Sequence, residues 1–154
     1  MSLSIACSAS RTATRPVSAH LTMAPREEQH CLLTWANKDA YCAVLGHART
    51  AFTESAARIS TPGSASQLSL VLTVENALFY EQARGGLTFD LRVKVDIKSP
   101  DGALIDTLHC NGDAPTFDTK GVQRASVEAG LAAARDFERR YSGSDAIAAW
   151  LASR

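Results

Sequence analysis

The sequence has no C-x-x-C pair, no run of about eighteen apolar residues and no excess of either charge. Zinc ribbons and thioredoxin-like redox sites need two sulfurs a short turn apart, so the cysteine spacing excludes both. No stretch is apolar for long enough to span a membrane as a helix. Because 16 basic residues balance 16 acidic ones, no field attracts polyanions, and we expect no nucleic-acid partner.

Two catalytic motifs are also missing. No G-x-S-x-G elbow holds a serine at a strained turn, which argues against the hydrolases that use one. The glycine pair Gly85-Gly86 opens a strand rather than a helix, so it does not form a phosphate-binding loop. We therefore expect no nucleotide and no other cofactor.

The clearest feature present is a strict alternation from Leu87 to Ile97, LTFDLRVKVDI. A period of two predicts a half-buried strand with one face in the core. Burial is worth about 1.5 to 3 kcal/mol for each apolar side chain, so a one-residue slip is strongly excluded. The expected core face consists of Leu87, Phe89, Leu91, Val93, Val95 and Ile97.

Before this strand the pattern predicts a short strand at His20–Met23 and a helix capped by Asn37 and ended by Pro62-Gly63-Ser64. His30 to Trp35 fits either a second short strand or the opening of a helix. Helical spacing gives the helix one apolar stripe, formed by Tyr41, Leu45, Ala48, Phe52, Ala56 and Ile59.

Strands from Gln67 to Phe79 and from Ala103 to Cys110 flank the alternating strand, joined by turns at 82–86 and 99–102. We expect a loop from Asn111 to Phe117, because it contains Pro115. A second helix, capped by Asp118 or Thr119, should end at Gly143, and Ser144 or Asp145 should cap a last short helix. The predicted stripe of the second helix is Val127, Leu131, Ala134, Phe137 and Tyr141.

These elements predict an α+β fold with an antiparallel sheet in the order β-α-β-β-β-α, both helices on one face and a short C-terminal helix. Residues 18–154 form a single domain in this interpretation, and residues 1–17 form a disordered tether, being small, hydroxylated and without periodicity. The other face of the sheet stays open to water or to a protein partner, which could also use an edge strand.

Candidate chemistry centres on the cluster from His109 to Asp113, where Cys110 follows a histidine directly. Neighbouring residues of a strand point to opposite faces, so His109 is poorly placed to activate Cys110. A reactive thiol at Cys110, in a small enzyme or a soluble ligand-binding protein, is the alternative to a non-enzymatic role. Metal binding is disfavoured, since His30-Cys31, His47 and His109-Cys110 lack the ligand spacing of zinc sites.

A disulfide between Cys31 and Cys42 depends on the segment before the first helix. A turn near Asn37 would let the two Cα atoms approach about 5.5 Å, as a disulfide requires. One unbroken helix over both would keep them about 16 Å apart. If they pair, Cys110 stays a free, mostly buried thiol.

On the polar face of the alternating strand, Asp90 and Asp96 flank Arg92 and Lys94. We interpret these charges as cross-strand pairs on an exposed sheet, and not as acid/base catalysts, because catalysis would need an apolar pocket that raises a carboxyl pKa.

Leu3-Ser4-Ile5-Ala6-Cys7-Ser8 resembles the end of a bacterial lipoprotein signal, in which the cysteine receives lipid. A chance match in a Ser/Ala-rich segment is the other interpretation. With the tether, the strand and helix that follow, the SPDGALID turn and strand, and the C-terminal Trp150-Leu151 pair, the chain resembles small periplasm-facing lipoproteins. Among these are the auxiliary lipoproteins of ABC-type lipid transport systems and other envelope-assembly components.

This resemblance implies lipid attachment at Cys7, contact with the membrane only through that lipid, and a location in the bacterial periplasm. It further implies a non-enzymatic accessory or partner-binding subunit of an envelope transport or assembly system, with a protein partner on the open sheet face or an edge strand.

Overall fold

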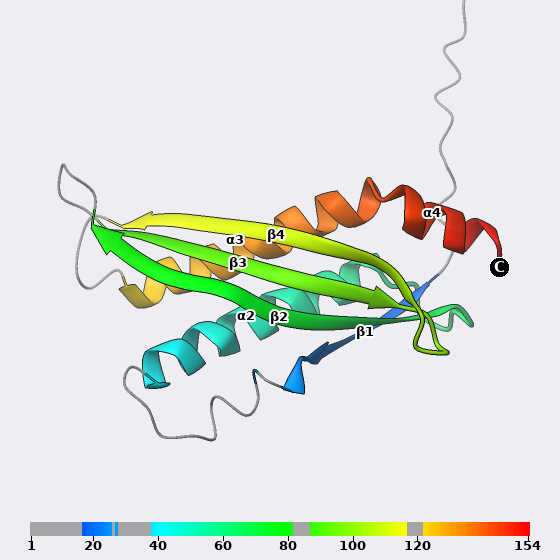
Figure 1. Cartoon of the computed structure of the whole chain (residues 1–154), viewed down its shortest axis with the longest axis horizontal. Helices are drawn as coiled ribbons and strands as arrows, with labels where there is room; N and C mark the ends of the chain where they lie inside the picture. Colours follow the sequence, from blue (N-terminus) through cyan, green and yellow to red (C-terminus); the bar gives the residue numbers. More distant parts are fainter. Residues whose placement is uncertain (1–16, 26, 28–37, 82–86, 117–121) are drawn as a thin grey trace, which may run out of the picture.

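The computed structural model describes residues 17–25, 27, 38–81, 87–116 and 122–154. It has two layers, a four-stranded sheet in the order β1-β2-β3-β4 and a layer of helices on one of its faces (Figure 1). Pro25 and Glu27, which come shortly after the end of β1 at Met23, are helical. The elements are β1 Ser18–Met23, α2 Lys38–Ile59, β2 Gln67–Glu81, β3 Leu87–Lys98, β4 Leu104–Thr116, α3 Val122–Ser142 and α4 Asp145–Ala152.

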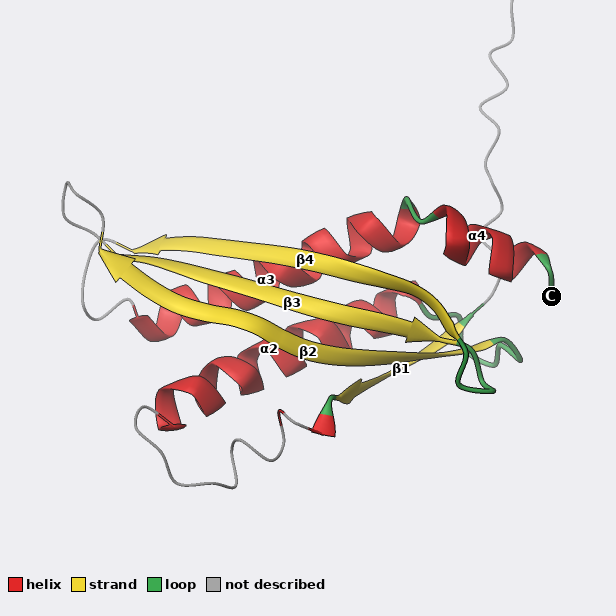
Figure 2. Cartoon of the chain, in the orientation of Figure 1, coloured by secondary structure: helices red, strands yellow, loops and turns green. Residues whose placement is uncertain are grey.

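The core lies between the sheet and the two long helices (Figure 2). The predicted face of β3 is confirmed from Phe89 to Ile97, where every second side chain is at most 1% exposed. Leu68 to Val74 of β2 alternate in the same way and pack beside them. Across the core, the rings of Phe52 on α2 and Phe137 on α3 have centroids 5.6 Å apart.

The prediction of an entirely antiparallel sheet is wrong for one pair. β2, β3 and β4 form the expected antiparallel meander, but β1 runs parallel to β2, with Ser18 opposite Gln67 and Met23 opposite Leu72. The reason is α2, whose 22 residues span about 33 Å and return the chain to the end where β1 began. A strand that follows such a crossover runs parallel to the first.

The predicted loop from Asn111 to Phe117 is also wrong, since β4 continues to Thr116 and pairs with β3 along its whole length. Pro115 lies opposite Thr88. Proline lacks a backbone donor, but β4 is an edge strand, and an edge strand tolerates proline when the missing N–H would face outward.

The buried face of the second long helix only partly matches the predicted stripe: Ala134 and Phe137 are buried as predicted, and Tyr141 packs against the core. Val127 and Leu131 are only half-buried, while small residues of the same helix face the sheet. The cause is the close approach of α3 to β4 at Gly112, which leaves room only for short side chains. The fully buried small residues of this face are Ala125, Ala129, Ala133 and Ala134.

The two ends of the domain are well defined. Val17, assigned to the tether from sequence, is 3% exposed, and its carbonyl accepts a hydrogen bond from the Thr61 N–H at 2.6 Å, so it belongs to the domain. Ser144 caps α4 as predicted, accepting the N–H of Ile147 at 3.2 Å. Residues 1–16, with Cys7, and the predicted caps Asn37, Asp118 and Thr119 lie outside the described residues.

Candidate functional site: the open face of the sheet

Both long helices cover the same face of the sheet, and the described residues place no element on the opposite face (Figures 1 and 2). β3 lies in the middle of this open face, with β2 and β4 on either side. The alternation predicted for β3 therefore turns a row of polar side chains to the surface. Its members are Asp90, Arg92, Lys94, Asp96 and Lys98.

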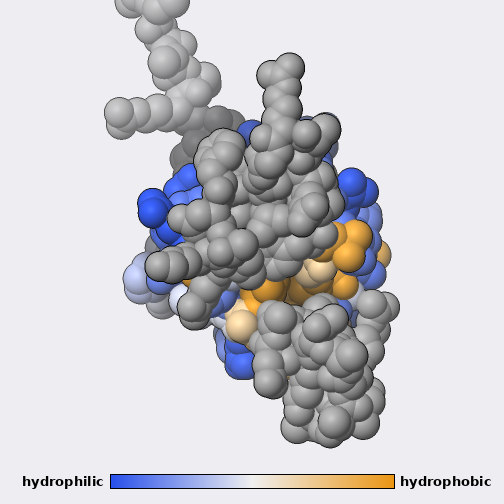
Figure 3. Space-filling model, turned by 90° about the vertical axis from the view of Figure 1, so that its left-hand side faces the viewer, coloured by the Kyte–Doolittle hydropathy of each residue, from blue (hydrophilic) through white to orange (hydrophobic). Residues whose placement is uncertain are grey.

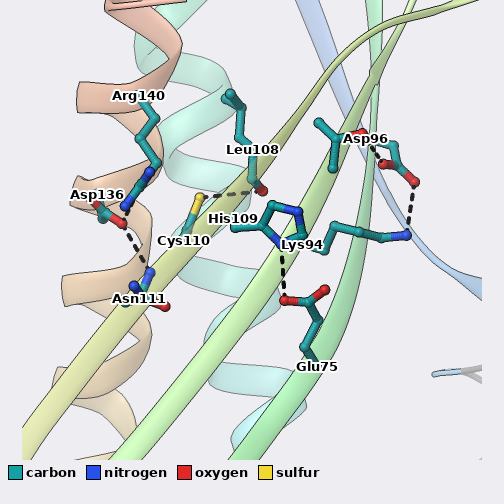
Figure 4. A network of polar contacts seen from close by, with 10 residues as sticks. Glu75, Lys94, Asp96, Leu108, His109, Cys110, Asn111, Asp136 and Arg140 are labelled. Atoms are coloured by element: carbon teal, nitrogen blue, oxygen red, sulfur yellow. Dashed lines mark hydrogen bonds and ion pairs between the residues drawn. The ribbon is translucent and has the colours of Figure 1, made fainter.

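Ion pairs connect this row along one strand. Arg92 lies 3.5 Å from Asp90, and Lys94 lies 3.5 Å from Asp96. The charges do face solvent as predicted, but the pairs form within β3 and not between strands, which corrects the prediction of cross-strand pairing. Asp96 also accepts a hydrogen bond at 2.8 Å from the hydroxyl of Thr107 on β4 (Figure 4).

A β-bulge in β2 adds a link across the face that the sequence did not reveal. The register between β2 and β3 shifts at Val74 to Asn76, leaving Glu75 as the extra residue. Its carboxylate lies 3.1 Å from Nδ1 of His109 on β4, above Lys94 of the intervening strand (Figure 4). Only the paired strands bring Glu75 and His109, far apart in sequence, into contact.

Acidic side chains gather toward the end of the face where β2 stops. Asp90 accepts a hydrogen bond at 3.0 Å from the Asn76 amide and lies directly opposite Asp113 of β4. Desolvation first, and then the hydrogen bond and negative charge of Asp90, raise the pKa of Asp113, while Arg92 acts in the opposite direction. This end of the open face therefore carries more carboxyl groups than basic groups.

The side chains of His109 and Cys110 lie on opposite faces of the sheet. The side chain of His109 is 61% exposed on the open face, whereas Cys110 is fully buried on the helix side. Burial raises the pKa of the Cys110 thiol to about 12, and the nearby Asp136 carboxylate adds to this effect. Cys110 is thus a free, buried thiol, and its burial and raised pKa disfavour the alternative of a reactive thiol at this position.

The described residues contain no group of three or more His, Cys, Asp or Glu side chains that could hold a metal ion. His47 lies on α2, and His109 is paired with Glu75. His30 and Cys31 lie outside the described residues. Cys42 forms a disulfide. Its partner lies outside the described residues, because the other described cysteine, Cys110, is free. The pairing of Cys42 with Cys31 therefore stays a prediction.

The outer edge of β4 is closed at three positions. Its backbone N–H groups at Thr107 and Asn111 are bonded to the carboxylates of Asp106, at 2.8 Å, and of Asp136 on α3, at 3.0 Å (Figure 4). Pro115, on the same outward side, has no N–H to offer. Arg140 holds Asp136 in place at 2.8 Å, and hydrogen bonds from both this guanidinium and the Asn111 N–H help to lower the pKa of Asp136 against the opposing effect of desolvation. An added strand is therefore disfavoured at this edge.

A second feature missed by the sequence analysis is Glu27, which is completely buried beside β2. Its Oε1 accepts the backbone N–H of Val74 at 3.1 Å. In sequence, Glu27 lies in a polar stretch after Pro25 that gives no local sign of burial. Only the meeting of β1, β2 and the chain that follows β1 places it in the interior.

None of the described helices is long and apolar enough to cross a membrane. No protein-family model matches the chain, and no curated protein matches it significantly. Among solved structures it is similar to a protein of Caulobacter crescentus CB15 that is provisionally named as a lipoprotein. The TM-score is 0.55 at 14% identity, over 88% of this chain and 91% of that chain.

A minor lipoprotein of Acinetobacter baumannii gives a TM-score of 0.45 at 12% identity, over 84% of this chain and 94% of that one. This score is too low to support an inference. The similarity to the Caulobacter protein shows that the two chains share a fold.

Proposed function

We propose that this chain is a lipid-anchored protein of the bacterial envelope whose domain faces the periplasm and binds another protein through the open face of its sheet. It acts without catalysis, as an accessory subunit of an envelope transport or assembly system. The observation that carries this proposal is the open face, which presents charged side chains of three strands and has no covering element in the described residues.

Two observations support the anchor. Leu3 to Ser8 has the residue types that precede and follow a lipid-modified cysteine at Cys7. The structural neighbour from Caulobacter, provisionally named as a lipoprotein, shares the fold over most of both chains. A lipid on Cys7 would hold the domain near a membrane surface by a short tether, without any apolar helix.

The arrangement of the open face supports protein binding. Ion pairs on solvent-exposed strands contribute little to stability, typically about 0 to 1 kcal/mol each. The stability of the fold therefore does not account for the ion pairs of this face. Complementary charges on a partner would raise the association rate and the specificity of binding more than its affinity. The burial of Cys110 away from His109 supports a role without catalysis.

Lipidation is tested by exporting the chain behind a leader with an apolar segment and feeding the cells a clickable palmitate. We expect label on the wild-type chain and none on Cys7→Ser, while Cys110→Ser, which removes a buried thiol, keeps it. Label that persists on Cys7→Ser would show that Cys7 is not the anchor.

Partner binding is tested with a photo-crosslinking amino acid in living cells. Placed at Lys94 or His109 on the open face, it should give a discrete crosslinked band with another protein. Placed at Arg49 or Thr53, which are exposed on the opposite, helical side, it should give none. Equal crosslinking from both sides, or none from the open face, would contradict the proposal.

A further inference from the structure

The short C-terminal helix α4 has an outer face with almost no charge. Between Asp145 at its start and Arg154, two residues past its end, it has no charged side chain. Ile147 is buried, and Trp150 and Leu151 pack against the core only in part. A helix at a protein surface usually turns charged residues outward, so this outer face suits surroundings less polar than water. Its exposed positions are Ala146, Ala148, Ala149 and Ala152.

The chain enters the domain at the end where α4 lies (Figures 1 and 2). Ser18, the first residue of β1, lies opposite the start of β2, which is beside the end of β3 and the start of β4. Near its start, β4 contacts α4 through the hydrogen bond that the Ser144 hydroxyl donates to Asp106. The entry point of the chain and α4 therefore belong to the same end of the domain.

The number of residues between Cys7 and the domain limits which end can face a membrane. Residues 8–16 are nine, and Val17 is fixed in the domain, so the extended chain reaches at most about 35 Å. β3 alone, with 12 residues, is about 40 Å long. Apolar residues are also visible at the opposite end of the domain (Figure 3), but a lipid on Cys7 does not reach past that end. The anchor therefore favours the α4 end as the one nearest the membrane.

The composition of residues 8–16 suits the same surface. They include Arg11 and Arg15 and no acidic residue. Basic residues beside a lipid anchor are attracted to anionic headgroups. Apart from a proline, residues 8–16 contain no apolar side chain larger than alanine, so they offer little to cover the outer face of α4.

Trp150 and Arg154 add two groups that lipid surfaces attract. The guanidinium carbon of Arg154 lies 4.5 Å from the centroid of the Trp150 ring. Tryptophan favours the boundary between acyl chains and headgroups, and arginine binds phosphate through paired hydrogen bonds. Arg154 is also near the turn between β3 and β4, since its charge adds a small contribution to the hydrogen bond from Ser99 that lowers the pKa of Asp101.

We propose that α4 lies on the membrane surface when the chain is anchored through Cys7, with Trp150 at the level of the headgroups and Arg154 on their phosphates. This inference rests on the lipid anchor of the proposed function, and it adds a contact made by the protein itself to the contact made by the lipid. An eight-residue helix has too little apolar area to bind a membrane strongly alone. The anchor makes the contact intramolecular, so a weak contact is enough.

Docking through α4 also sets the direction of the domain. The strands then run away from the membrane, and the open face of the sheet stands at the side, accessible to a protein partner. The membrane-binding end and the partner-binding face are separate surfaces, so each can be tested without the other.

The test holds the full chain on vesicles without using Cys7. Six histidines placed before Met1 bind nickel-chelating lipid in vesicles of phosphatidylethanolamine and phosphatidylglycerol, with or without bromine on the acyl chains. Trp35→Phe leaves Trp150 as the single tryptophan. We expect bromine to quench Trp150 and its emission to shift to shorter wavelength on the vesicles.

A control chain places the single tryptophan at the opposite end of the domain. It combines Trp35→Phe and Trp150→Phe with Leu78→Trp, because Leu78 is 58% exposed. Bromine should leave the fluorescence of this control unchanged. Quenching of the control equal to that of Trp150, or no quenching of Trp150, would overturn the proposal.

A pair of variants at Ala149 tests the outer face of α4. Ala149→Glu adds a carboxylate at an exposed position, while Ala149→Gln adds similar volume without charge. The ratio of docked to undocked chain, read from the quenching of Trp150, should fall at least about fivefold in Ala149→Glu and less in Ala149→Gln. Circular dichroism checks that both variants fold, and equal quenching in a folded Ala149→Glu variant would contradict the docking.

Two further outcomes separate this inference from its alternatives. Self-association of the chain without vesicles, abolished by Ala149→Glu, would assign the outer face of α4 to a second copy and overturn the proposal. Palmitate labelling of Cys7 without quenching of Trp150 would leave the anchor in place and refute docking alone. Quenching of Trp150 without palmitate labelling would support lipid binding by α4 and refute the anchor of the proposed function.

Discussion

Gly112 of β4 and Ala133 of α3 approach so closely that no side chain fits between them. A Cβ at Gly112 would lie 2.6 Å from the backbone nitrogen of Ala133 and 2.1 Å from the carbonyl oxygen of Ala129. Both are backbone atoms, so the helix would have to move as a unit. The contact fixes how deeply α3 sits on the sheet and, with Asp136, how it covers the edge of β4.

Gly112→Ala should therefore destabilise the domain by about 3 kcal/mol or more, because it overpacks a rigid contact. Gly46→Ala is the matched control, since Gly46 is exposed on α2 with nothing within 4 Å of the added methyl group. It should stabilise by about 0.5 to 1 kcal/mol through helix propensity. Urea unfolding followed by circular dichroism measures both, and equal stabilities of the two variants would contradict the packing described here.

Glu27→Ala should destabilise the domain by about 1 to 3 kcal/mol, because it leaves the buried N–H of Val74 without its acceptor. Glu27→Gln keeps an acceptor oxygen in the same place and should cost less. Amide hydrogen exchange at Val74 gives a local reading, with protection lost in the alanine variant and largely kept in the glutamine variant. A protected Val74 amide in Glu27→Ala would mean that the carboxylate is not its acceptor.

Cys110 should be inert to thiol reagents in the folded protein. In a Cys7→Ser background, which removes one other cysteine, Ellman's reagent at pH 7.5 should label Cys110 only after denaturation. Since folding raises the pKa of this thiol from 9.0 to about 12, the unfolded chain loses its proton first. The contribution of this neutral, buried thiol to the free energy of unfolding is complete below pH 9 and is lost between pH 9 and about 12. Cys110→Ala should flatten that part of the stability profile, and an unchanged profile would count against the burial.

The hydroxyl of Tyr141 is buried and has no hydrogen-bond partner among the described residues, and burial raises its pKa to about 12. Tyr141→Phe removes the unpaired hydroxyl and keeps the ring contact with Phe137, whose centroid is 5.9 Å away. We expect the variant to be more stable by up to about 1 kcal/mol. Tyr141→Leu, which loses the ring contact as well, should be less stable than wild type in the same thermal unfolding experiment.

The asymmetric charge of the open face could be predicted only in part. The sequence places Asp90, Arg92, Lys94 and Asp96 on one side of β3, because a strand alternates its side chains. It does not show which carboxyl faces which, since the positions of Asp113 and Glu75 depend on the register of β4 and on the bulge in β2. Cross-strand neighbours are set by pairing, and pairing is not local.

By itself, the sequence determined the elements whose periodicity is strong: the core face of β3, the apolar stripe of α2 around Phe52, the meander and the cap at Ser144. Burial of many apolar side chains on one face outweighs any local alternative, so these segments have one solution. Tertiary structure alone decided the parallel pairing of β1, the continuation of β4 through Asn111 to Thr116, and the burial of Glu27. In each of these the local preference is weak or points elsewhere, and hydrogen bonds to a distant strand or helix supply the free energy that local sequence lacks.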